Sequence, residues 1–456
     1  MASDTTENAV TQMLNECPRL RILVVGKSGA GKSSLISYAF GVDKESVSQH
    51  APGQANIDHE IFPPQNPVVV VHDSMGFEPG KPENLERAEK FVRRRTGADV
   101  PLKEQVHIIW LCIQVPHAGG RVFEDGDEIF LRLASERNVP VLVVFTQFDK
   151  VIDSFRKHRE EKETRANQKF EKLCVVPLGE MSPEFQYART AGLSSGRFAK
   201  PDIPALANLV EMSRDLVRNR GCGDAWLVYS IAQRASAKVT IEACVAIGMK
   251  GHWNILCSTA KFPGWTLNQC LDKIHDEMVD SWNFYDPRGR LRDGELRKKM
   301  KILAQLAAPS DVSEARTWFP DVSSDTIQQL IVPVIGTTAT VVAGLAIGLS
   351  VSFGTMLATA YQNTEPTLRC FMAYIVGLTL ILHKLFIRLL RWPPEELSEE
   401  DIAVILETYE LSIYSAYDDI RRYVNKAVWR MKLSSGPAQK EVIELLRKFT
   451  GIGEAA

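Results

Sequence analysis

The amino-acid sequence predicts an α/β fold, in which a doubly wound, mostly parallel sheet in the N-terminal half is followed by an all-α C-terminal region. Short runs rich in Val and Ile, as expected for strands buried on both faces, lie at residues 20–25, 67–71, 106–115 and 140–145. Helical patterns separate these runs, which is typical of a sheet covered by helices on both faces. Beyond residue 222 the strand pattern ends and helical periodicity dominates.

Changes of composition divide the chain into parts. We expect a flexible N-terminus at residues 1–18, the α/β domain at 19–222, a helical middle region and linker at 223–325, and a hydrophobic helical domain at 326–456. Residues 57–62 alternate and precede a proline-rich turn, so an edge strand that returns antiparallel onto residues 68–71 is expected there. A helix around residues 205–217 is expected near the end of the α/β domain.

The composition is that of a folded protein, because 45% of the 456 residues are hydrophobic and 24% are charged. A net charge of −2 gives no general attraction to nucleic acid, and none is expected as a partner. The eight cysteines form no CxxC pair, which argues against a structural zinc site and a secreted disulfide framework. Since the first residues lack a signal-peptide pattern, a cytoplasmic location is expected.

A phosphate-binding loop follows the first predicted strand. The sequence GKSGAGKS at residues 26–33 fits GxxxxGK[ST], and a helix is expected directly after it. Glycines let backbone N–H groups turn inward as an anion nest, and the helix N-terminus adds partial positive charge. Lys32 is expected to reach the β- and γ-phosphates, and Ser33 to ligate Mg²⁺. The residues predicted to contact the nucleotide here are Gly26, Lys27, Ser28, Gly29, Ala30, Gly31, Lys32, Ser33 and Ser34.

A second phosphate element, DSMG at residues 73–76, follows the valine-rich run. A carboxylate at Asp73 can hold the Mg²⁺ shell through water, and the N–H of Gly76 can contact the γ-phosphate. Asp73 and Ser33 are therefore the predicted metal ligands. Lys32, Ser33 and Gly76 are the predicted catalytic residues, because they would stabilise charge on the transferred phosphoryl group.

The fourth predicted strand ends in TQFD at residues 146–149, which has the spacing of the base-reading motif [NT]KxD with Gln in place of Lys. The Asp149 carboxylate can accept hydrogen bonds from the N1–H and 2-amino groups of guanine, whereas adenine offers neither donor. The predicted cofactors are therefore GTP or GDP with Mg²⁺. An alternative for Asp149 is the N-cap of the following helix. The residues predicted to contact the base are Thr146, Gln147, Asp149 and, in a further loop, Ala191.

The order GxxxxGKS, DxxG and TQxD resembles the Ras-like P-loop GTPases of the translation-factor class, over about residues 20–220. The loop wording GKSGAGKSS is similar to the septin- and Era-like branch of that class. HDSMGFEPG, HIIWLCI followed by AGGR, and WNFYDP resemble a group of fungal G-domain proteins with hydrophobic helical C-terminal regions. The resemblance implies a Ras-like G domain and a GTPase that converts GTP to GDP and phosphate as a nucleotide-dependent switch.

The sequence departs from that pattern at two places. Phe77 stands where Ras-type enzymes carry the glutamine that orients the attacking water. No Thr lies between Ser33 and Asp73, which leaves Ser46 or Ser48 as the second loop ligand of Mg²⁺. Slow intrinsic hydrolysis is therefore expected.

An arginine supplied in trans by a homodimer or a GTPase-activating partner could complete the site. Arg93, Arg94, Arg95 and Arg121 are the candidates. The alternative is a solvated helix face for the first three and a loop charge for Arg121.

The C-terminal region leaves membrane association open. Residues 326–364 contain no charged side chain and are long enough to span a bilayer. A second apolar run lies at residues 371–382. Either these segments enter a membrane, or they form the buried centre of a soluble bundle covered by the amphipathic residues 398–431 and by residues 223–306.

Three functions follow from these observations. The first is a GTP-binding switch with slow GTPase activity. The second is an ATP-dependent P-loop enzyme such as a kinase, which leaves Asp149 unexplained. The third is a nucleotide-binding scaffold or membrane-interaction protein with negligible hydrolysis, suggested by Phe77 and the missing Thr.

Overall fold

The computed structural model describes residues 9–42, 56–74, 77, 82–97, 99–116, 121–155, 159–181, 184–193, 201–221, 223–250, 267–306, 365–390, 396–425 and 435–451. The chain forms two compact units. One consists mainly of Gln12–Thr240, and the other mainly of Ile241–Leu389 and Glu395–Ala456. The boundaries predicted at residues 18, 222 and 325 stay predictions.

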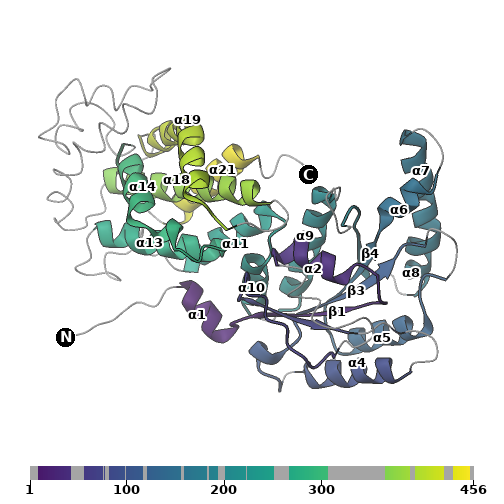
Figure 1. The fold of residues 1–456 in the computed structure, drawn as a ribbon. Helices are drawn as coiled ribbons and strands as arrows, with labels where there is room; N and C mark the ends of the chain where they lie inside the picture. The colour runs from purple at the N-terminus through teal and green to yellow at the C-terminus, as the bar shows by residue number, and fades with distance from the viewer. Residues whose placement is uncertain are drawn as a thin grey trace, which may run out of the picture. The chain divides into compact units, whose positions relative to one another are not determined.

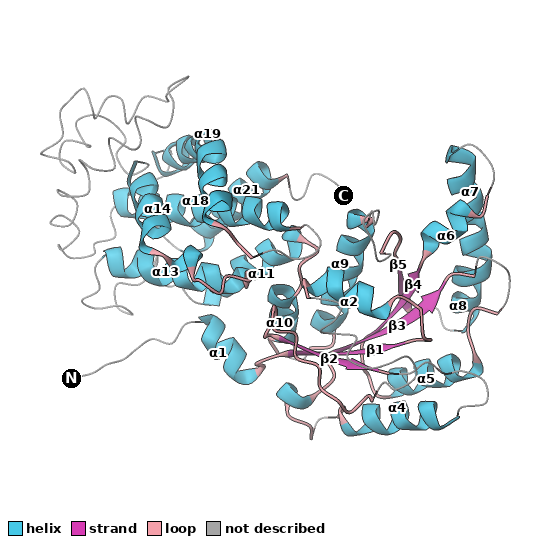
Figure 2. Cartoon of the chain, in the orientation of Figure 1, coloured by secondary structure: helices cyan, strands magenta, loops and turns pink. Residues whose placement is uncertain are grey.

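The first unit is built on a parallel sheet, which confirms the predicted fold class. Its strands are β1 (Leu20–Val25), β2 (Val69–Asp73), β3 (Ile108–Gln114), β4 (Val141–Thr146) and β5 (Gln186–Arg189). All neighbouring strands pair in parallel, in the order β2-β1-β3-β4-β5. β1 and β4, two of the strands drawn in magenta in Figure 2, are buried along their whole length, as their largely apolar sequences require.

Helices cover both faces of this sheet. α2 (Lys32–Phe40), α9 (Ile203–Asn219) and α10 (Ala225–Ala232) lie on one face, and α4 (Pro82–Arg94) and α5 (Asp125–Glu136) on the other (Figure 1). α6 (Phe148–Asp153), α7 (Arg159–Phe170), a π-helical turn (Glu171–Val175) and α8 (Val176–Met181) connect β4 to β5. α1 (Ala9–Glu16) precedes β1, a 3-10 helix (Leu102–Glu104) precedes β3, and α11 (Ala237–Lys250) follows α10.

The edge strand predicted at residues 57–62 is wrong. In its place the structure has an isolated antiparallel bridge between Ile61 and Val71. Two prolines follow at once, and because proline has no N–H it cannot extend the ladder. The Asn66 side chain then donates hydrogen bonds to the carbonyl oxygens of Phe40 and Ala232 (both 2.7 Å), which holds the segment in a turn against α2 and α10.

The second unit is helical. It contains α13 (Leu267–Trp282), a 3-10 helix (Arg290–Arg292), α14 (Gly294–Leu306), α18 (Glu365–Leu389), α19 (Glu399–Asn425) and α21 (Ser435–Thr450). α18 packs against α13, α14, α19 and α21 and is the central helix of the bundle. α19 buries Ile405, Ile413 and Ile420, which belong to the amphipathic region predicted at residues 398–431.

Among the described residues, Leu368–Leu389 in α18 is the one helix that is long and apolar enough to cross a membrane. Its most apolar stretch is 89% buried inside the protein, and the core helix of a soluble protein passes the same test. This burial favours the bundle-centre interpretation for residues 371–382. Residues 326–364 lie outside the described residues, so their interpretation stays open.

The close packing of α18 depends on Gly377. A Cβ there would lie 2.8 Å from the Tyr417 hydroxyl oxygen and 3.2 Å from Met300 Cε, and both side chains are fully buried. Because a packed core cannot yield easily, we expect Gly377→Val to lower the free energy of unfolding of the helical unit by about 1–3 kcal/mol. Chemical denaturation followed by far-UV circular dichroism measures this. Gly294→Ala is the control, since no atom lies within 4 Å of a Cβ there; equal losses for both variants would contradict the prediction.

Candidate nucleotide-binding site

The residues predicted to bind nucleotide lie at the carboxyl edge of the parallel sheet. The phosphate loop follows β1, Asp73 ends β2, Thr146 ends β4, and Ala191 comes shortly after β5. In open α/β sheets this edge binds ligands at the point where the strand order reverses, which here is the β1–β3 boundary.

The phosphate loop passes directly over β3. Gly26 has φ of 151°, and a Cβ there would lie 2.3 Å from the carbonyl oxygen of Cys112. Gly31 is the N-cap of α2, in a left-handed conformation, and its carbonyl accepts the first helical hydrogen bond from Leu35 N–H at 2.9 Å. Burial raises the pKa of the Cys112 thiol to about 12, so this cysteine stays neutral under the loop.

Lys32 folds back over the loop. Its Nζ donates hydrogen bonds to the carbonyl oxygens of Gly26 (2.8 Å) and Lys27 (3.3 Å). The same Nζ lies 3.7 Å from Oδ1 of Asp73, and the Lys32 side chain is only 12% exposed. The lysine of the first motif and the carboxylate of the second are therefore neighbours, although 41 positions separate them in the sequence.

The residues at this point fit a magnesium ion held together with phosphate. Ser33 lies in the first turn of α2, and Asp73 ends the neighbouring strand, so a hydroxyl and a carboxylate are offered. Mg²⁺ prefers such oxygen ligands and takes few of them from the protein. In the described part of the chain, no group of three or more His, Cys, Asp and Glu side chains could form a fuller protein cage. Gly76, Ser46 and Ser48 lie outside the described residues.

Two side chains of the TQFD motif hold the phosphate loop. The Thr146 hydroxyl donates to the carbonyl oxygen of Ala30 at 2.7 Å. The Gln147 amide donates to the carbonyl oxygen of Gly29 at 2.6 Å, from a left-handed backbone conformation with φ of 59°. The residue that stands where lysine is usual thus fixes the phosphate loop through a neutral hydrogen bond.

Asp149 contacts the loop that contains Ala191. Its Oδ1 accepts a hydrogen bond from the backbone N–H of Gly192 at 3.0 Å, so the two elements predicted to read the base are joined. The helix-cap alternative for Asp149 is wrong, because the N-cap of α6 is Gln147 and Asp149 lies inside the first turn. The Asp149 carboxylate can therefore serve both the Gly192 N–H and a ligand.

Phe77 is buried in the hydrophobic core and cannot orient a water molecule. It is 4% exposed, and its ring centroid lies 5.1 Å from that of Phe130 on α5. A Cβ on Gly126 would lie 2.6 Å from Phe77 Cβ, which shows how tightly the ring is enclosed. The side chain that replaces the usual glutamine is a core residue.

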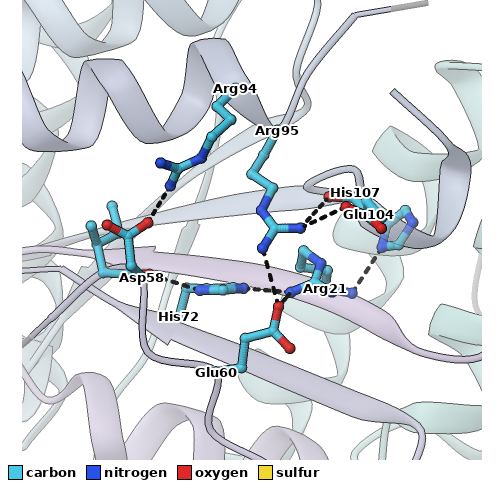
Figure 3. Close-up of polar contacts among 9 residues, drawn as sticks. Arg21, Asp58, Glu60, His72, Arg94, Arg95, Glu104 and His107 are labelled. Atoms are coloured by element: carbon cyan, nitrogen blue, oxygen red, sulfur yellow. Dashed lines mark hydrogen bonds and ion pairs between the residues drawn. The ribbon is translucent and has the colours of Figure 1, made fainter. Parts of the chain in front are cut away.

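Three of the four arginine candidates, Arg94, Arg95 and Arg121, form ion pairs within the chain. Arg94 pairs with Asp58, and Arg95 donates to Glu60 Oε1 at 3.2 Å, as Figure 3 shows. Arg121 donates to Asp125 (2.6 Å) and Glu128 (2.8 Å). Arg121 is 59% exposed and could exchange these partners more easily than Arg95, which is 20% exposed.

A polar network around Arg21, at the amino end of β1, was not predicted from the sequence. Arg21 of β1 donates to Glu60 Oε1 (2.5 Å) and to Nε2 of His72 (2.7 Å), and the other ring nitrogen of His72 donates to the carbonyl oxygen of Ile57 (2.7 Å) (Figure 3). We call Arg21, Glu60, His72 and Arg95 the Arg21 cluster. It joins β1, β2 and the end of α4 to residues 57–60. Its only signal in the sequence is a charged residue inside an otherwise apolar strand.

His107 is locked in its neutral form. Its Nδ1 accepts from the Arg21 backbone N–H at 2.8 Å, and its Nε2 donates to the carbonyl oxygen of Leu102 at 3.0 Å. Burial is the main cause that lowers its pKa to about 4, from an ordinary value of 6.5. Between about pH 6.5 and pH 4, His107 is therefore protonated in the unfolded chain but neutral in the folded chain.

We expect this histidine to make the first unit less stable in weak acid. Stability is lost as the pH falls from about 6.5 to about 4, by about 2 kcal/mol at pH 5 from this group alone. Chemical denaturation at pH 7.5 and pH 5.0, read by hydrogen exchange in β1 and β3, measures the difference. His107→Gln should cost stability at both pH values but reduce the pH-dependent part; an unchanged pH dependence would refute the assignment.

The sheet order, the phosphate loop between β1 and α2, and the base motif after β4 fit a P-loop GTPase domain. The chain is 22% identical over 169 residues to the GTPase Der of Ureaplasma urealyticum serovar 10, covering 37% of this chain and 36% of that protein. It is 23% identical over 165 residues to the GTPase Der of Ureaplasma parvum serovar 3, covering 36% of each. The chain thus matches about a third of the length of these relatives. Residues 290–452 match a family described as a domain of unknown function, DUF8505.

Proposed function

We propose that the chain binds GTP and GDP with Mg²⁺, hydrolyses GTP slowly to GDP and phosphate, and acts as a nucleotide-dependent switch. The observation that carries the proposal is the junction of the base and phosphate elements. Asp149 is bonded to Gly192, and the residues just before it are bonded to the phosphate loop. Guanine and phosphate subsites are thereby fixed relative to each other. The name of the relatives, GTPase Der, supports the same activity.

Each residue has a defined task in this proposal. Lys32 and the loop N–H groups between Gly26 and Ser34 hold the phosphates, and Ala191 borders the base. Ser33 and Asp73 would hold Mg²⁺, which when bound neutralises charge that develops between the β- and γ-phosphates. Gly76 would offer its N–H to the γ-phosphate. Asp149 would accept the two guanine N–H donors, which excludes adenine.

A second candidate function is nucleotide binding with negligible hydrolysis. The buried position of Phe77 favours it, since this side chain cannot orient water. The ion pair of Arg95 favours it as well, because this arginine is only 20% exposed and already pairs with Glu60 of its own chain. Hydrolysis would then depend on a partner that supplies an arginine.

Binding of fluorescent GDP, GTP and ATP analogues to the full chain, with and without Mg²⁺, tests the nucleotide class. Selective, Mg²⁺-dependent guanine binding is expected. A preference for ATP, or no binding by the folded chain, would overturn the proposal. Phosphate release at saturating GTP, with Lys32→Ala as the inactive control, separates the two functions: release above the control supports the slow GTPase, and release equal to it supports the binding protein.

A further inference from the structure

Arg189, the last residue of β5, is stacked on the base-reading motif. The centre of its guanidinium lies 3.8 Å from the centroid of the Phe148 ring and 5.2 Å from that of Phe170. One guanidinium nitrogen donates to the Asn167 side-chain oxygen at 2.6 Å. Phe148 is the residue between Gln147 and Asp149 and is 4% exposed, so this stack fixes the middle of the TQFD motif.

The same arginine begins the loop that carries Ala191. Its neighbour Thr190 donates its N–H to the carbonyl oxygen of Phe145 at 2.8 Å, and the Thr190 carbonyl accepts from the Phe148 N–H at 3.3 Å. Two residues later, the Gly192 N–H reaches Asp149. Arg189 thus directly precedes the loop that contains Ala191, and its side chain stacks on Phe148 of the TQFD motif. In Figure 2, α6 follows the end of β4 beside β5.

The residue type suits this task. A planar guanidinium can stack on an aromatic ring and still form hydrogen bonds at its edge, which a lysine ammonium cannot do. Arg189 is half-buried, and burial lowers its pKa, although the nearby Asp202 opposes that change. Stacking on Phe148 and the hydrogen bond that the guanidinium donates to Asn167 Oδ1 offset the lost hydration. The ring of Phe170 packs edge-on against that of Phe148, with 5.7 Å between the ring centroids.

We propose that Arg189 is a positioning residue for guanine recognition, which holds Phe148 so that the Asp149 carboxylate faces the N1–H and 2-amino groups of the base. The inference rests on the proposed function. It assigns to α7, through Asn167 and Phe170, a role in supporting the base site. Arg189 itself touches no ligand in this scheme. Its loss lets the TQFD turn shift relative to the Ala191 loop.

Comparison of GTP with inosine triphosphate separates positioning from general stability. Inosine triphosphate lacks the 2-amino group, so its weaker binding reports one hydrogen bond to Asp149. In the unchanged chain we expect GTP to bind about 10- to 100-fold more tightly, the value of one charge-assisted hydrogen bond. In Arg189→Ala we expect this preference to fall to about threefold, because the carboxylate no longer meets the 2-amino group.

Arg189→Lys keeps the charge but not the planar stack, and it should restore little of the preference. Arg87→Ala, an exposed change on α4, is the matched control and should leave the ratio unchanged. If Arg189→Ala does not fold, Asn167→Ala, which removes only the hydrogen bond to the guanidinium, should reduce the preference about twofold to threefold. Thermal melting of each variant checks that the fold is kept.

The outcomes separate failure of the proposed function from failure of the positioning role of Arg189. If the unchanged chain does not prefer guanine to adenine nucleotides, the proposed function fails. If it does, and Arg189→Ala and Asn167→Ala weaken GTP and inosine triphosphate by the same factor or by none, the positioning role of Arg189 is overturned while the proposed function stands. Loss of the preference in Arg189→Ala, with the Arg87→Ala control unchanged, supports the inference.

Discussion

Replacing Asp149 by asparagine is expected to change the preference of the chain from GTP to xanthosine triphosphate. The carboxylate oxygens of Asp149 accept from guanine N1–H and the 2-amino group, whereas an amide presents one acceptor and one donor. Two hydrogen bonds to a charged acceptor contribute about 3–6 kcal/mol, so GTP should bind about 100-fold more weakly or worse. Xanthine carries an oxygen in place of the 2-amino group and suits the amide donor.

Competition of both triphosphates against a fluorescent GDP analogue measures the change. Asp153→Asn is the matched control, because it makes the same charge change at an exposed position at the end of the same helix, α6. Equal weakening of both nucleotides would indicate damage to the Gly192 contact rather than loss of base reading. No effect at all would remove Asp149 from the site.

The sheet and the phosphate loop could be predicted from the sequence because their signals are local. Strand β4 is an apolar run and β1 is interrupted by Arg21 alone, and the predicted bounds at residues 20–25 and 140–145 agree with Leu20–Val25 and Val141–Thr146 within one residue. Each motif directly follows a predicted strand. Because parallel strands bring their carboxyl ends to one edge of the sheet, the motif residues are expected to meet at that edge. The sequence predicts that Lys32 and Asp73 both serve the phosphate and Mg²⁺ region, and in the structure Lys32 Nζ lies 3.7 Å from Asp73 Oδ1.

Features that depend on contacts between distant residues could not be predicted. β5 has the sequence QYAR with one fully buried position, so it lacks the apolar run that marks an inner strand. The stack of Arg189 on Phe148 joins residues 41 positions apart with no motif between them. Arg21 and His72 interrupt apolar strands for a reason that becomes visible only when Glu60 and Ile57 lie beside them.

Gln147 departs from the [NT]KxD motif, in which lysine is usual, but it still contacts the phosphate loop. Lysine at this position would bring a positive charge near the base and the loop. Glutamine keeps a donor for the Gly29 carbonyl and gives up the charge. On the proposed function, a nucleotide would meet a phosphate loop held by this hydrogen bond and would lack the attraction of a lysine charge.

Gly26→Ala is expected to weaken nucleotide binding severely. A Cβ at this position would lie 2.3 Å from the carbonyl oxygen of Cys112. That oxygen belongs to β3, which pairs with β1 on one side and β4 on the other, so it cannot retreat. The loop itself must move, and its inward-pointing N–H groups move with it.

We expect Gly26→Ala to lower the stability of the first unit by about 2–3 kcal/mol and to weaken GDP binding about 100-fold. Gly29→Ala is the control within the same loop, because no atom lies within 4 Å of a Cβ there and only its left-handed backbone, with φ of 78°, opposes the change, at about 1 kcal/mol. Denaturation midpoints and GDP affinities of both variants decide the matter. The close approach of the loop to β3 would be refuted by equal effects, whereas a large difference would show that the glycine at Gly26 is required by a neighbouring strand and not by the flexibility of the loop.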